Sequence, residues 1–383
     1  MVSCSPSPNW FELINIREIA SPALLVFRAR VEENVRRMLN LCGGPERLRP
    51  HIKTHKMREV IELQLSLGIT KFKCATIAEA KMAAQAGVSD LLLAYQPVGP
   101  NVCRVIELMK QFPQTKFLVV CDDAGAIREL SSGLQRHPSA IRKEHETKDD
   151  LEVLLDLDIG QHRTGVSTGP EATELYQVIA SSPRLKSGGL HAYDGHISTR
   201  DPVERKLACD SAFAAVVDFR QQLLSRGLPV SRVVAGGTPT FPVHAARADV
   251  ECSPGTCVFW DAGYAQKLPE MDFLPAALVL TRVVSKPGPN RLCLDLGHKA
   301  IASEMPHPRV QLIGLEDAKA ILHSEEHLVV ESACAPQFKV GDCLYGIPWH
   351  ICPTVALYSE AAAVENQQAV SKWKIARDRC LSI

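Results

Sequence analysis

The segment FKCATIAEAKMAAQAGVSDLLLA, residues 72–94, decides the fold class. It begins with the short β-rich run Phe72 to Ala75, continues as an amphipathic stretch from Ile77 to Gly87, and ends in a second apolar run, Leu91 to Ala94. A strand, a helix closed by glycine and a further strand form a βαβ unit, whose two strands lie parallel in one sheet. The segment therefore predicts an α/β fold with a parallel sheet.

The same rhythm extends along the chain from about residue 22 to residue 235. About eight such units in roughly 240 residues match a TIM-like (β/α)8 barrel better than an open doubly wound sheet. Polar residues at the C-terminal ends of the strands are therefore expected to form the active site. The remaining predicted strands are Ala23 to Phe27, Leu48 to Lys53, Phe117 to Cys121, Leu151 to Asp158, Leu185 to His191 and Val233 to Ala235, and the remaining helices include Val31 to Leu41, Val102 to Phe112 and Glu204 to Arg226.

Past about residue 275 the pattern changes to successive strands separated by turn signals, as in Ala276 to Ser285 and His327 to Glu331. We therefore expect three parts. These are an N-terminal segment, residues 1–20, that packs with the β-domain, a barrel over residues 21–270, and a C-terminal antiparallel β-domain over residues 271–383. The charged segment Pro138 to Asp150 is expected to be a surface loop.

Composition narrows the class of partner. The chain has 383 residues, 46% of them hydrophobic, and 43 basic side chains balance 43 acidic ones. Such a balance offers no basic surplus for nucleic acid or an anionic membrane and favours a small-molecule substrate. Residues 1–18 lack the apolar core of a signal peptide, and no run approaches the roughly 20 apolar residues of a membrane span. The 13 cysteines are scattered, which favours reduced thiols in a cytoplasm.

The stretch Arg49-Pro50-His51-Ile52-Lys53-Thr54-His55-Lys56 carries the strongest functional signal. It places Lys53 at the C-terminal end of a predicted strand, flanked by His51 and His55. Burial and neighbouring cations lower the pKa of an amine, and a neutral amine can form a Schiff base with pyridoxal 5'-phosphate (PLP). The alternative is an ordinary solvated basic turn.

Two glycine-bearing loops follow the last predicted barrel strands. The first is Ala235-Gly236-Gly237-Thr238-Pro239-Thr240 and the second is Ser253-Pro254-Gly255-Thr256. Backbone amides exposed by glycine, with a threonine hydroxyl beside them, can hold a phosphate, and barrels often place such a site after strands seven and eight. Glycine and proline after a strand can also form a simple turn.

Two further strand ends carry candidate side chains. Arg163 lies just beyond a strand end, where it could contact a cofactor oxygen or a substrate carboxylate, or form an ion pair with Asp158. His191 and Tyr193 are two residues apart and therefore on the same side of a strand. One of them could stack on a pyridine ring and another could move a proton, or both could be hydrogen-bonded wall residues.

The β-domain contains His350-Ile351-Cys352-Pro353-Thr354. On an extended strand His350 and Cys352 face the same way, as two ligands of a zinc-like ion would. Two ligands leave positions open, and an open site can polarise a substrate hydroxyl. Structural packing is the alternative. The pair His323 and His327, at helical spacing, is a competing metal candidate or a solvated polar loop.

Together these motifs resemble the D-threonine aldolase and D-serine dehydratase family. Its members are fold-type III PLP enzymes with an alanine-racemase-like barrel and a C-terminal β-domain. The resemblance spans nearly the whole chain. Its matches are Ser21 to Val26, Asn34 to Met38, Arg49 to Lys56, Thr76 to Ala80, Ala86-Gly87, Gly160 to Gly165, Tyr193 to His196, Gly236 to Thr240, Pro254 to Thr256, Asp295 to Lys299 and His350 to Thr354.

The resemblance implies a role for each candidate. Lys53 is the Schiff-base lysine, with His51, Arg163 and Tyr193 lining the cofactor. Lys53, His191 and Tyr193 are the expected catalytic residues, with either His191 or a bound water as the base for the substrate hydroxyl. The phosphate is held by Gly236, Gly237, Thr238, Gly255 and Thr256, the divalent metal (zinc, manganese or similar) is bound by His350 and Cys352, and the subunits form a homodimer.

Departures from the racemases argue against simple racemisation. Ser253 stands where alanine racemases place an arginine facing the pyridine nitrogen, and the β-domain offers His350 and Cys352 in place of a catalytic tyrosine. Cysteine as second metal ligand is more typical of dehydratases, whereas Pro353-Thr354-Val355 is aldolase-like. Cys257 occupies a position that is usually aromatic.

The resulting expectation is a PLP- and metal-dependent lyase acting on D-3-hydroxy amino acids. Aldolase-type cleavage to glycine and an aldehyde is the first expectation. The second is a dehydratase for D-serine or D-3-hydroxyaspartate, which would release a 2-oxo acid and ammonia. A third hypothesis is a non-catalytic PLP carrier on the same barrel.

Overall fold

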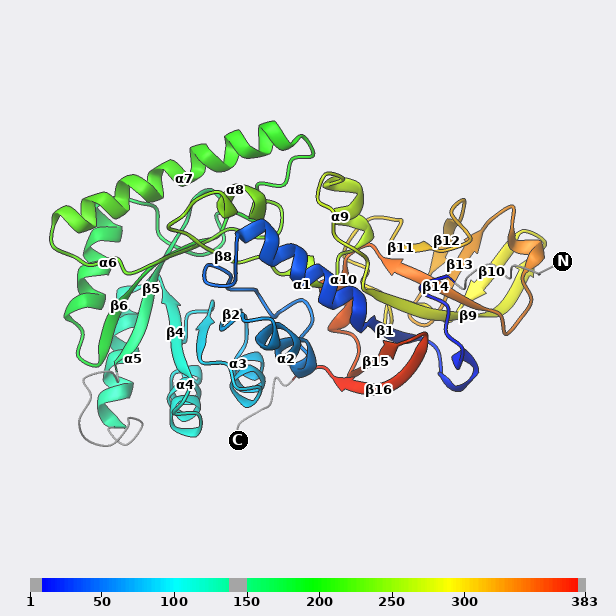
Figure 1. Cartoon of the computed structure of the whole chain (residues 1–383), viewed down its shortest axis with the longest axis horizontal. Coiled ribbons are helices and arrows are strands. Elements are labelled where there is room, and N and C mark those ends of the chain that lie inside the picture. Colours follow the sequence, from blue (N-terminus) through cyan, green and yellow to red (C-terminus); the bar gives the residue numbers. More distant parts are fainter. Residues whose placement is uncertain (1–8, 138–149, 378–383) are drawn as a thin grey trace. The chain divides into compact units, whose positions relative to one another are not determined.

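The computed structural model describes residues 9–137 and 150–377 (Figure 1). These residues form two compact units. We call residues 35–137, 150–257 and 376–377 the barrel unit, and residues 9–34 and 258–375 the β-rich unit. The predicted loop from Pro138 to Asp150 lies outside the described residues as far as residue 149. In the described part of the chain, no helix combines the length and apolar composition that crossing a bilayer requires.

The barrel unit is built on a parallel sheet of seven strands whose spatial order follows the sequence. Neighbouring strands start side by side, since Lys71 pairs with Asp90 and Asp90 pairs with Lys116. Sequential parallel strands joined by helical crossovers are the arrangement of a (β/α) barrel. The strands are β2 (Lys71–Cys74), β3 (Asp90–Leu93), β4 (Lys116–Cys121), β5 (Leu151–Leu157), β6 (Leu185–Ala192), β7 (Val233–Ala235) and β8 (Glu251–Cys252).

The predicted strand from Leu48 to Lys53 closes the ring. Leu48 forms a parallel bridge to Cys252 of β8, and His51 forms a parallel bridge to Lys73 of β2. Backbone hydrogen bonds of 2.9 Å support the closure on both sides. The sheet therefore curls into a closed barrel, which confirms the predicted fold.

Arg49 fixes this closure from inside. Its side chain is fully buried and forms ion pairs with Asp90 of β3 at 2.6 Å and Glu251 of β8 at 2.7 Å. Because a buried guanidinium needs compensating charges, the two carboxylates hold the closing segment against both strands.

Helices lie outside the barrel strands (Figure 1). Three of them begin at residues whose side chains accept a hydrogen bond from the first turn, namely Thr76, Asp123 and Asp201. The helices predicted from apolar spacing are present, with ends shifted by a few residues. They are α1 (Arg28–Cys42), α3 (Ile77–Gln85), α4 (Pro100–Gln111) and α7 (Pro202–Ser225). The further helices are α2 (Arg58–Ser66), α5 (Ala124–Arg136), α6 (Pro170–Ser181) and α8 (Phe241–Ala245).

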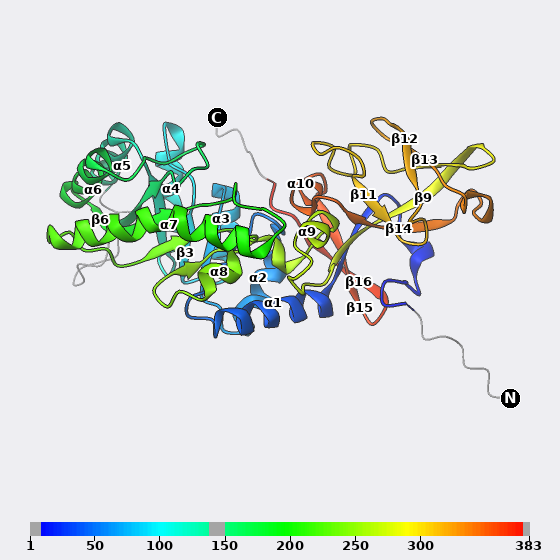
Figure 2. The same ribbon diagram turned by 90° about the horizontal axis from the view of Figure 1, so that it is seen from above.

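The β-rich unit is organised around β9, which pairs with β1, β10 and β14 (Figure 2). All its strand pairs are antiparallel except β1 with β15, so the predicted antiparallel domain is confirmed with one parallel pair. Residues 258–270, which the prediction included in the barrel, group with this unit. Its elements are β1 (Ala23–Phe27), α9 (Ala262–Lys267), β9 (Ala277–Gly288), β10 (Arg291–Leu294), β11 (Val310–Leu312), β12 (Lys319–His323), β13 (Leu328–Glu331), β14 (Cys343–Pro348), α10 (Ile351–Val355), β15 (Glu360–Glu365) and β16 (Gln368–Lys374).

The prediction placed Ala23 to Phe27 among the barrel strands, and this was wrong. These residues form β1 in the sheet of the β-rich unit. A short apolar run shows that a strand is buried but not which sheet buries it. The N-terminal segment joins the same core, because Leu13 packs in a cluster with Leu278 and Tyr345, and its backbone NH donates to the Tyr345 hydroxyl at 3.0 Å.

Candidate active site

A pocket opens at the carboxyl ends of the barrel strands. Its lining includes side chains from the closing segment, from β2 and from the ends of β5 and β6. The hollow measures about 50 Å3, since several long side chains gather in it. The pocket brings together five residues that were predicted for the site, namely His51, Lys53, Arg163, His191 and Tyr193.

The Tyr193 ring is the centre of this group. The Lys53 Nζ lies 5.8 Å from its centroid, the Lys73 Nζ 5.7 Å, and the Arg163 guanidinium carbon 5.0 Å. The predicted alternative of an Arg163–Asp158 ion pair is not formed, because Asp158 binds His162 at 2.8 Å. Three cationic side chains around one aromatic ring make the pocket a site for an anionic or electron-rich ligand.

A chain of buried polar groups forms the floor of the pocket. The Asp156 carboxylate accepts a hydrogen bond from His191 Nδ1 at 2.6 Å, and His191 Nε2 lies 3.5 Å from Lys73 Nζ. Burial is the main cause that lowers the pKa of His191, although Asp156 opposes it. Burial, together with the charge of Lys53, lowers the pKa of Lys73 to about 7. The imidazole is therefore neutral, with its Nδ1 proton fixed toward Asp156.

The two predicted phosphate loops meet above this floor. Thr238 Oγ1 accepts hydrogen bonds from the backbone amides of Gly255 at 3.2 Å and Thr256 at 3.0 Å. A Cβ on Gly255 would lie 3.2 Å from His51 O, and one on Gly237 would lie 3.1 Å from the Tyr193 ring. The Gly255 loop therefore packs against the turn that carries Lys53, the Gly237 loop packs against Tyr193, and neither glycine leaves room for a larger residue.

Asp194, Cys209 and His244 are a group of three buried metal-ligating side chains within the described residues. His244 Nδ1 accepts a hydrogen bond from the Arg247 guanidinium at 2.7 Å, so its proton sits on Nε2 and is donated to Asp194 at 2.8 Å. Burial raises the pKa of the Cys209 thiol to about 12. A protonated nitrogen and a thiol are poor ligands, so the group is a hydrogen-bonded cluster rather than a metal centre.

His350 and Cys352 lie in the β-rich unit, at the turn between β14 and α10. The extended strand predicted for them is wrong, because Cys352 is helical. Their side chains nevertheless meet in a hydrogen bond, and His350 Nδ1 lies 2.5 Å from a Glu304 carboxylate oxygen. Burial would lower the pKa of His350, but these two partners raise it to about 9. Asp261, which precedes α9, accepts a hydrogen bond from Ile351 N at the start of α10 at 3.0 Å.

The competing pair His323 and His327 does not form a metal site. The two residues flank the turn of a β-hairpin between β12 and β13, so the helical spacing does not apply. His323 Nδ1 accepts from Arg309 at 2.9 Å, and its Nε2 donates to Leu296 O at 3.2 Å. Both ring nitrogens are occupied, which leaves none for a metal ion.

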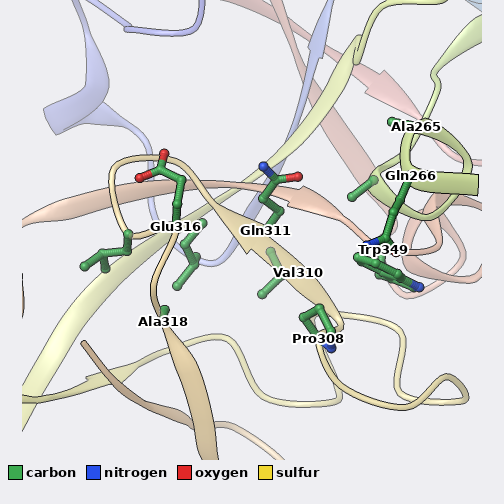
Figure 3. Close-up of a pocket in the computed structure, with 11 residues that line it drawn as sticks. Ala265, Gln266, Pro308, Val310, Gln311, Glu316, Ala318 and Trp349 are labelled. Atoms are coloured by element: carbon green, nitrogen blue, oxygen red, sulfur yellow. The ribbon is translucent and has the colours of Figure 1, made fainter. Parts of the chain in front are cut away.

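The β-rich unit also contains a larger hollow, of about 470 Å3 (Figure 3). Its walls come from α9, β11 and the loop after β11, with Trp349 on one side. Gln266, Gln311 and Glu316 contribute polar side chains, and the described residues that line it include no lysine, histidine or cysteine. Size alone therefore does not identify the chemical site, and the reactive groups gather in the smaller barrel pocket.

Comparison with known proteins assigns the family. The alanine racemase N-terminal domain matches residues 26–262, and the putative serine dehydratase domain matches residues 276–364. The chain is 30% identical to 3-hydroxy-D-aspartate aldolase of Paracoccus denitrificans, with 94% of this chain and 92% of that protein covered. The chain belongs to the D-threonine aldolase and D-serine dehydratase family.

Further family members agree with this assignment. D-threonine aldolase of an Arthrobacter species is 29% identical, with 94% of this chain and 93% of that protein covered. The solved D-threonine aldolase from Filomicrobium marinum superposes with a TM-score of 0.83 at 25% identity, covering 94% of this chain and 96% of that one. The predicted family and its lyase class are confirmed, and relatives named as dehydratases match at 23–24% identity.

Several residues of the site were missed from the sequence. Lys73, Asp156, His244 and Glu304 received no role. Lys73 did leave a signal, since it is a lysine inside a parallel strand, where buried strands are normally apolar throughout. Glu304 left none, because nothing in the sequence places it beside a histidine 46 residues later.

Proposed function

We propose that the protein is a PLP- and divalent-metal-dependent lyase of D-3-hydroxy amino acids, with aldolase-type cleavage to glycine and an aldehyde as its reaction. The observation that carries this proposal is the junction of three segments at one end of the barrel. The Lys53 turn, the Gly236–Thr238 loop and the Gly255–Thr256 loop are in direct contact there. The Gly255 and Thr256 amides converge on one oxygen atom, that of the Thr238 hydroxyl, and a phosphate oxygen of PLP would take that place while the Lys53 amine takes the aldehyde.

The residues fit PLP in the following way. Lys53 provides the amine for the cofactor aldehyde, and Gly236, Gly237, Thr238, Gly255 and Thr256 hold the phosphate. His51, Arg163 and Tyr193 line the ring, with Arg163 placed for an anionic oxygen. His51 stays neutral, because burial and the nearby lysines lower its pKa well below the usual value. Bound PLP supplies an electron sink for the bond that breaks.

The donor set of the β-rich unit fits a divalent metal. An imidazole nitrogen and a thiol sulfur meet at His350 and Cys352, and Glu304 orients the imidazole through Nδ1. A carboxylate behind a histidine is the usual support of a metal ligand, because it fixes the tautomer and directs the other ring nitrogen outward. An ion held by two protein ligands supplies a Lewis acid for a substrate hydroxyl oxygen.

A side chain of the protein must hold the proton that leaves the substrate hydroxyl during the reaction. Cleavage takes a proton from the β-hydroxyl and returns one to the α-carbon, so the net count is unchanged. We assign this work to His191, because Asp156 fixes the Nδ1 proton and leaves Nε2, which lies 3.5 Å from Lys73 Nζ, as the nitrogen that can accept one. Tyr193, in contact range of three cations, is the proposed wall that positions the reacting groups.

Aldolase activity is preferred over the alternatives for two reasons. The relatives of 29–30% identity are named aldolases, whereas the dehydratases match at 23–24%. A non-catalytic carrier has no need of a metal-type donor set. The dehydratase remains the second candidate because Cys352 offers a thiol as metal ligand.

One assay separates these functions. Purified protein with PLP and a divalent metal is offered D-threonine, D-serine and 3-hydroxy-D-aspartate, each beside its L-form, with and without chelator. Glycine release from the D-forms, lost on chelation, is the expected result. Ammonia without glycine would transfer the function to the dehydratase. If neither glycine nor ammonia is released, the result would favour the non-catalytic carrier. Glycine and ammonia are the products to measure. An assay for 2-oxo acids would not distinguish the two reactions, because aldolase cleavage of hydroxyaspartate releases glyoxylate, which is itself a 2-oxo acid.

We further propose a homodimer in the cytoplasm. The described cysteines are free thiols, as expected in a reducing compartment. Light scattering at several concentrations tests the dimer.

A further inference from the structure

Lys73 is a second lysine in the barrel pocket, and the proposed cofactor chemistry does not use it. It lies in β2, its residue is 2% exposed, and its side chain lines the same hollow as Lys53. An ammonium buried this deeply costs free energy, so a lysine at this place needs a reason.

The hydrogen-bond geometry limits what His191 can do alone. Asp156 accepts the Nδ1 proton, so the only base nitrogen of His191 is Nε2. That nitrogen lies 3.5 Å from Lys73 Nζ. Because Nε2 carries only a lone pair in this tautomer, the Lys73 amine is the donor in this contact. Lys73 is therefore placed to exchange a proton with His191 Nε2.

We propose that Lys73 is the proton-relay partner of His191, and that Lys73, His191 and Asp156 together hold the proton moved during the lyase reaction. In the transfer, an N–H bond of Lys73 breaks as an N–H bond forms at His191 Nε2. The net charge of the pair is unchanged, and the reverse transfer restores the starting state. Asp156 stays ionised and stabilises the imidazolium while it exists. This inference rests on the proposed function for its substrate, but not for its proton chemistry.

The groups around Lys73 suit an amine that changes its charge. Cations raise the cost of its protonated form, and carboxylates lower that cost, so the two forms lie close in free energy. Burial is the main cause of its lowered pKa, which is about 7. The titratable and charged groups that face it are Arg49, His51 and Lys53 from the closing segment, Asp156 from β5, His191 from β6, and Tyr193 and Asp194 from the turn after β6.

Two substitutions separate a relay from a fixed charge. Lys73→Arg keeps a cation that does not lose its proton. Lys73→Met keeps an unbranched side chain of similar length that has no titratable proton. The same Lys→Met change at exposed Lys81 on α3 serves as the control. Circular dichroism checks that each variant folds.

The first measurement follows the visible absorption of the PLP-loaded protein against pH, which needs no turnover. A transition near pH 7 is expected in the parent protein and in Lys81→Met, and it should be absent from both Lys73 variants. The PLP dissociation constant should stay within a few-fold. A transition that persists in Lys73→Met would overturn the relay, and so would a loss of PLP binding in both variants.

The second measurement compares turnover. Both Lys73 variants should lose about 100-fold or more in kcat, the range of one general acid–base group. The double variant Lys73→Met with His191→Gln should lose little more than either single variant, because one broken link already stops the relay. Full activity in Lys73→Arg would overturn the relay in favour of a fixed charge. If the parent protein turns over none of the hydroxy amino acids, the proposed function fails while the absorption result still decides the relay.

Discussion

Asp194 accepts a hydrogen bond from His244 Nε2 at 2.8 Å, directly behind the loop proposed to bind phosphate. Its other carboxylate oxygen accepts from the Thr240 hydroxyl at 2.7 Å, and Thr240 Oγ1 in turn accepts from Gly237 N at 3.3 Å. Burial would raise the pKa of Asp194, but these partners lower it, so the carboxylate stays ionised. One buried carboxylate thus holds the shape of the Gly236–Thr238 turn.

Asp194→Asn should therefore weaken PLP binding without changing the reaction. The two carboxylate oxygens of Asp194 accept hydrogen bonds from His244 and Thr240. The amide of the variant replaces one of these oxygens with an NH2 group, which cannot accept, so one buried hydrogen bond is lost. Such a loss costs about 1–3 kcal/mol, or about 5- to 150-fold in the dissociation constant. Titration of the apoprotein with PLP measures it. Asp249→Asn is the control, since Asp249 is an exposed partner of Arg220. Equal affinity in the parent protein and Asp194→Asn would show that the turn holds its shape unaided.

Lys53→Ala should abolish the visible absorption of bound PLP. Two lysines line the pocket, so the result decides which of them binds the aldehyde. Borohydride reduction of the parent protein, followed by peptide mass spectrometry, should find the cofactor on residue 53. Lys56→Ala is the control on the same turn, where the lysine pairs with Glu79 instead. A band that survives in Lys53→Ala, with the label on residue 73, would reverse the assignment.

The barrel was predictable from the sequence because its signals are local. The 3.6-residue spacing of α3 and α4, and the short apolar runs between helices, required no knowledge of distant contacts. The strand ends then located Lys53, Arg163 and His191, since parallel strands deliver their C-terminal residues to one face. Glycine and threonine after the last barrel strands indicated the phosphate loops, and the resemblance supported them.

What the sequence could not show depends on contacts between distant segments. The sheet that β1 joins is decided by pairing with β9 and β15, more than 200 residues away in the chain. Lys73 meets His191 across the barrel, and Glu304 meets His350 between two loops. The turn at His350 also misled the prediction, because Pro353 within the first turn of α10 is compatible with a helix start as well as with an irregular strand.

Two substitutions test the metal site of the β-rich unit. Cys352→Ala should remove bound divalent metal, because it deletes one of two ligands. Glu304→Gln should retain the ligands but weaken metal affinity about 10- to 100-fold, the usual effect of removing the group that orients a ligating histidine. Metal content after dialysis and calorimetric titration provide the measurements. Cys334→Ala, in the same unit, is the control. Unchanged metal content in Cys352→Ala would exclude this site.

Arg49→Met should destabilise the barrel unit strongly. The substitution leaves the carboxylates of Asp90 and Glu251 without the cation that they share, and breaking a buried pair in this way costs about 3–5 kcal/mol. Arg58→Met is the matched control, because Arg58 and Glu62 form an exposed pair worth about 0–1 kcal/mol. Urea denaturation measures both. Similar losses in the two variants would mean that the closing ion pairs do not determine the stability of the barrel.

Lys73→Met should change how the stability of the cofactor-free protein depends on pH. Burial lowers the pKa of Lys73 from 10.5 to about 7 in the folded state. Between these values the unfolded chain binds more protons than the folded one, so the free energy of unfolding rises with pH. Below the folded pKa the fold bears the cost of a buried cation. The variant should therefore gain stability over the parent protein at pH 6, and the gain should shrink by pH 9. Urea midpoints at the two pH values provide the measurement, and a gain of equal size at both would show that Lys73 does not titrate in the folded barrel.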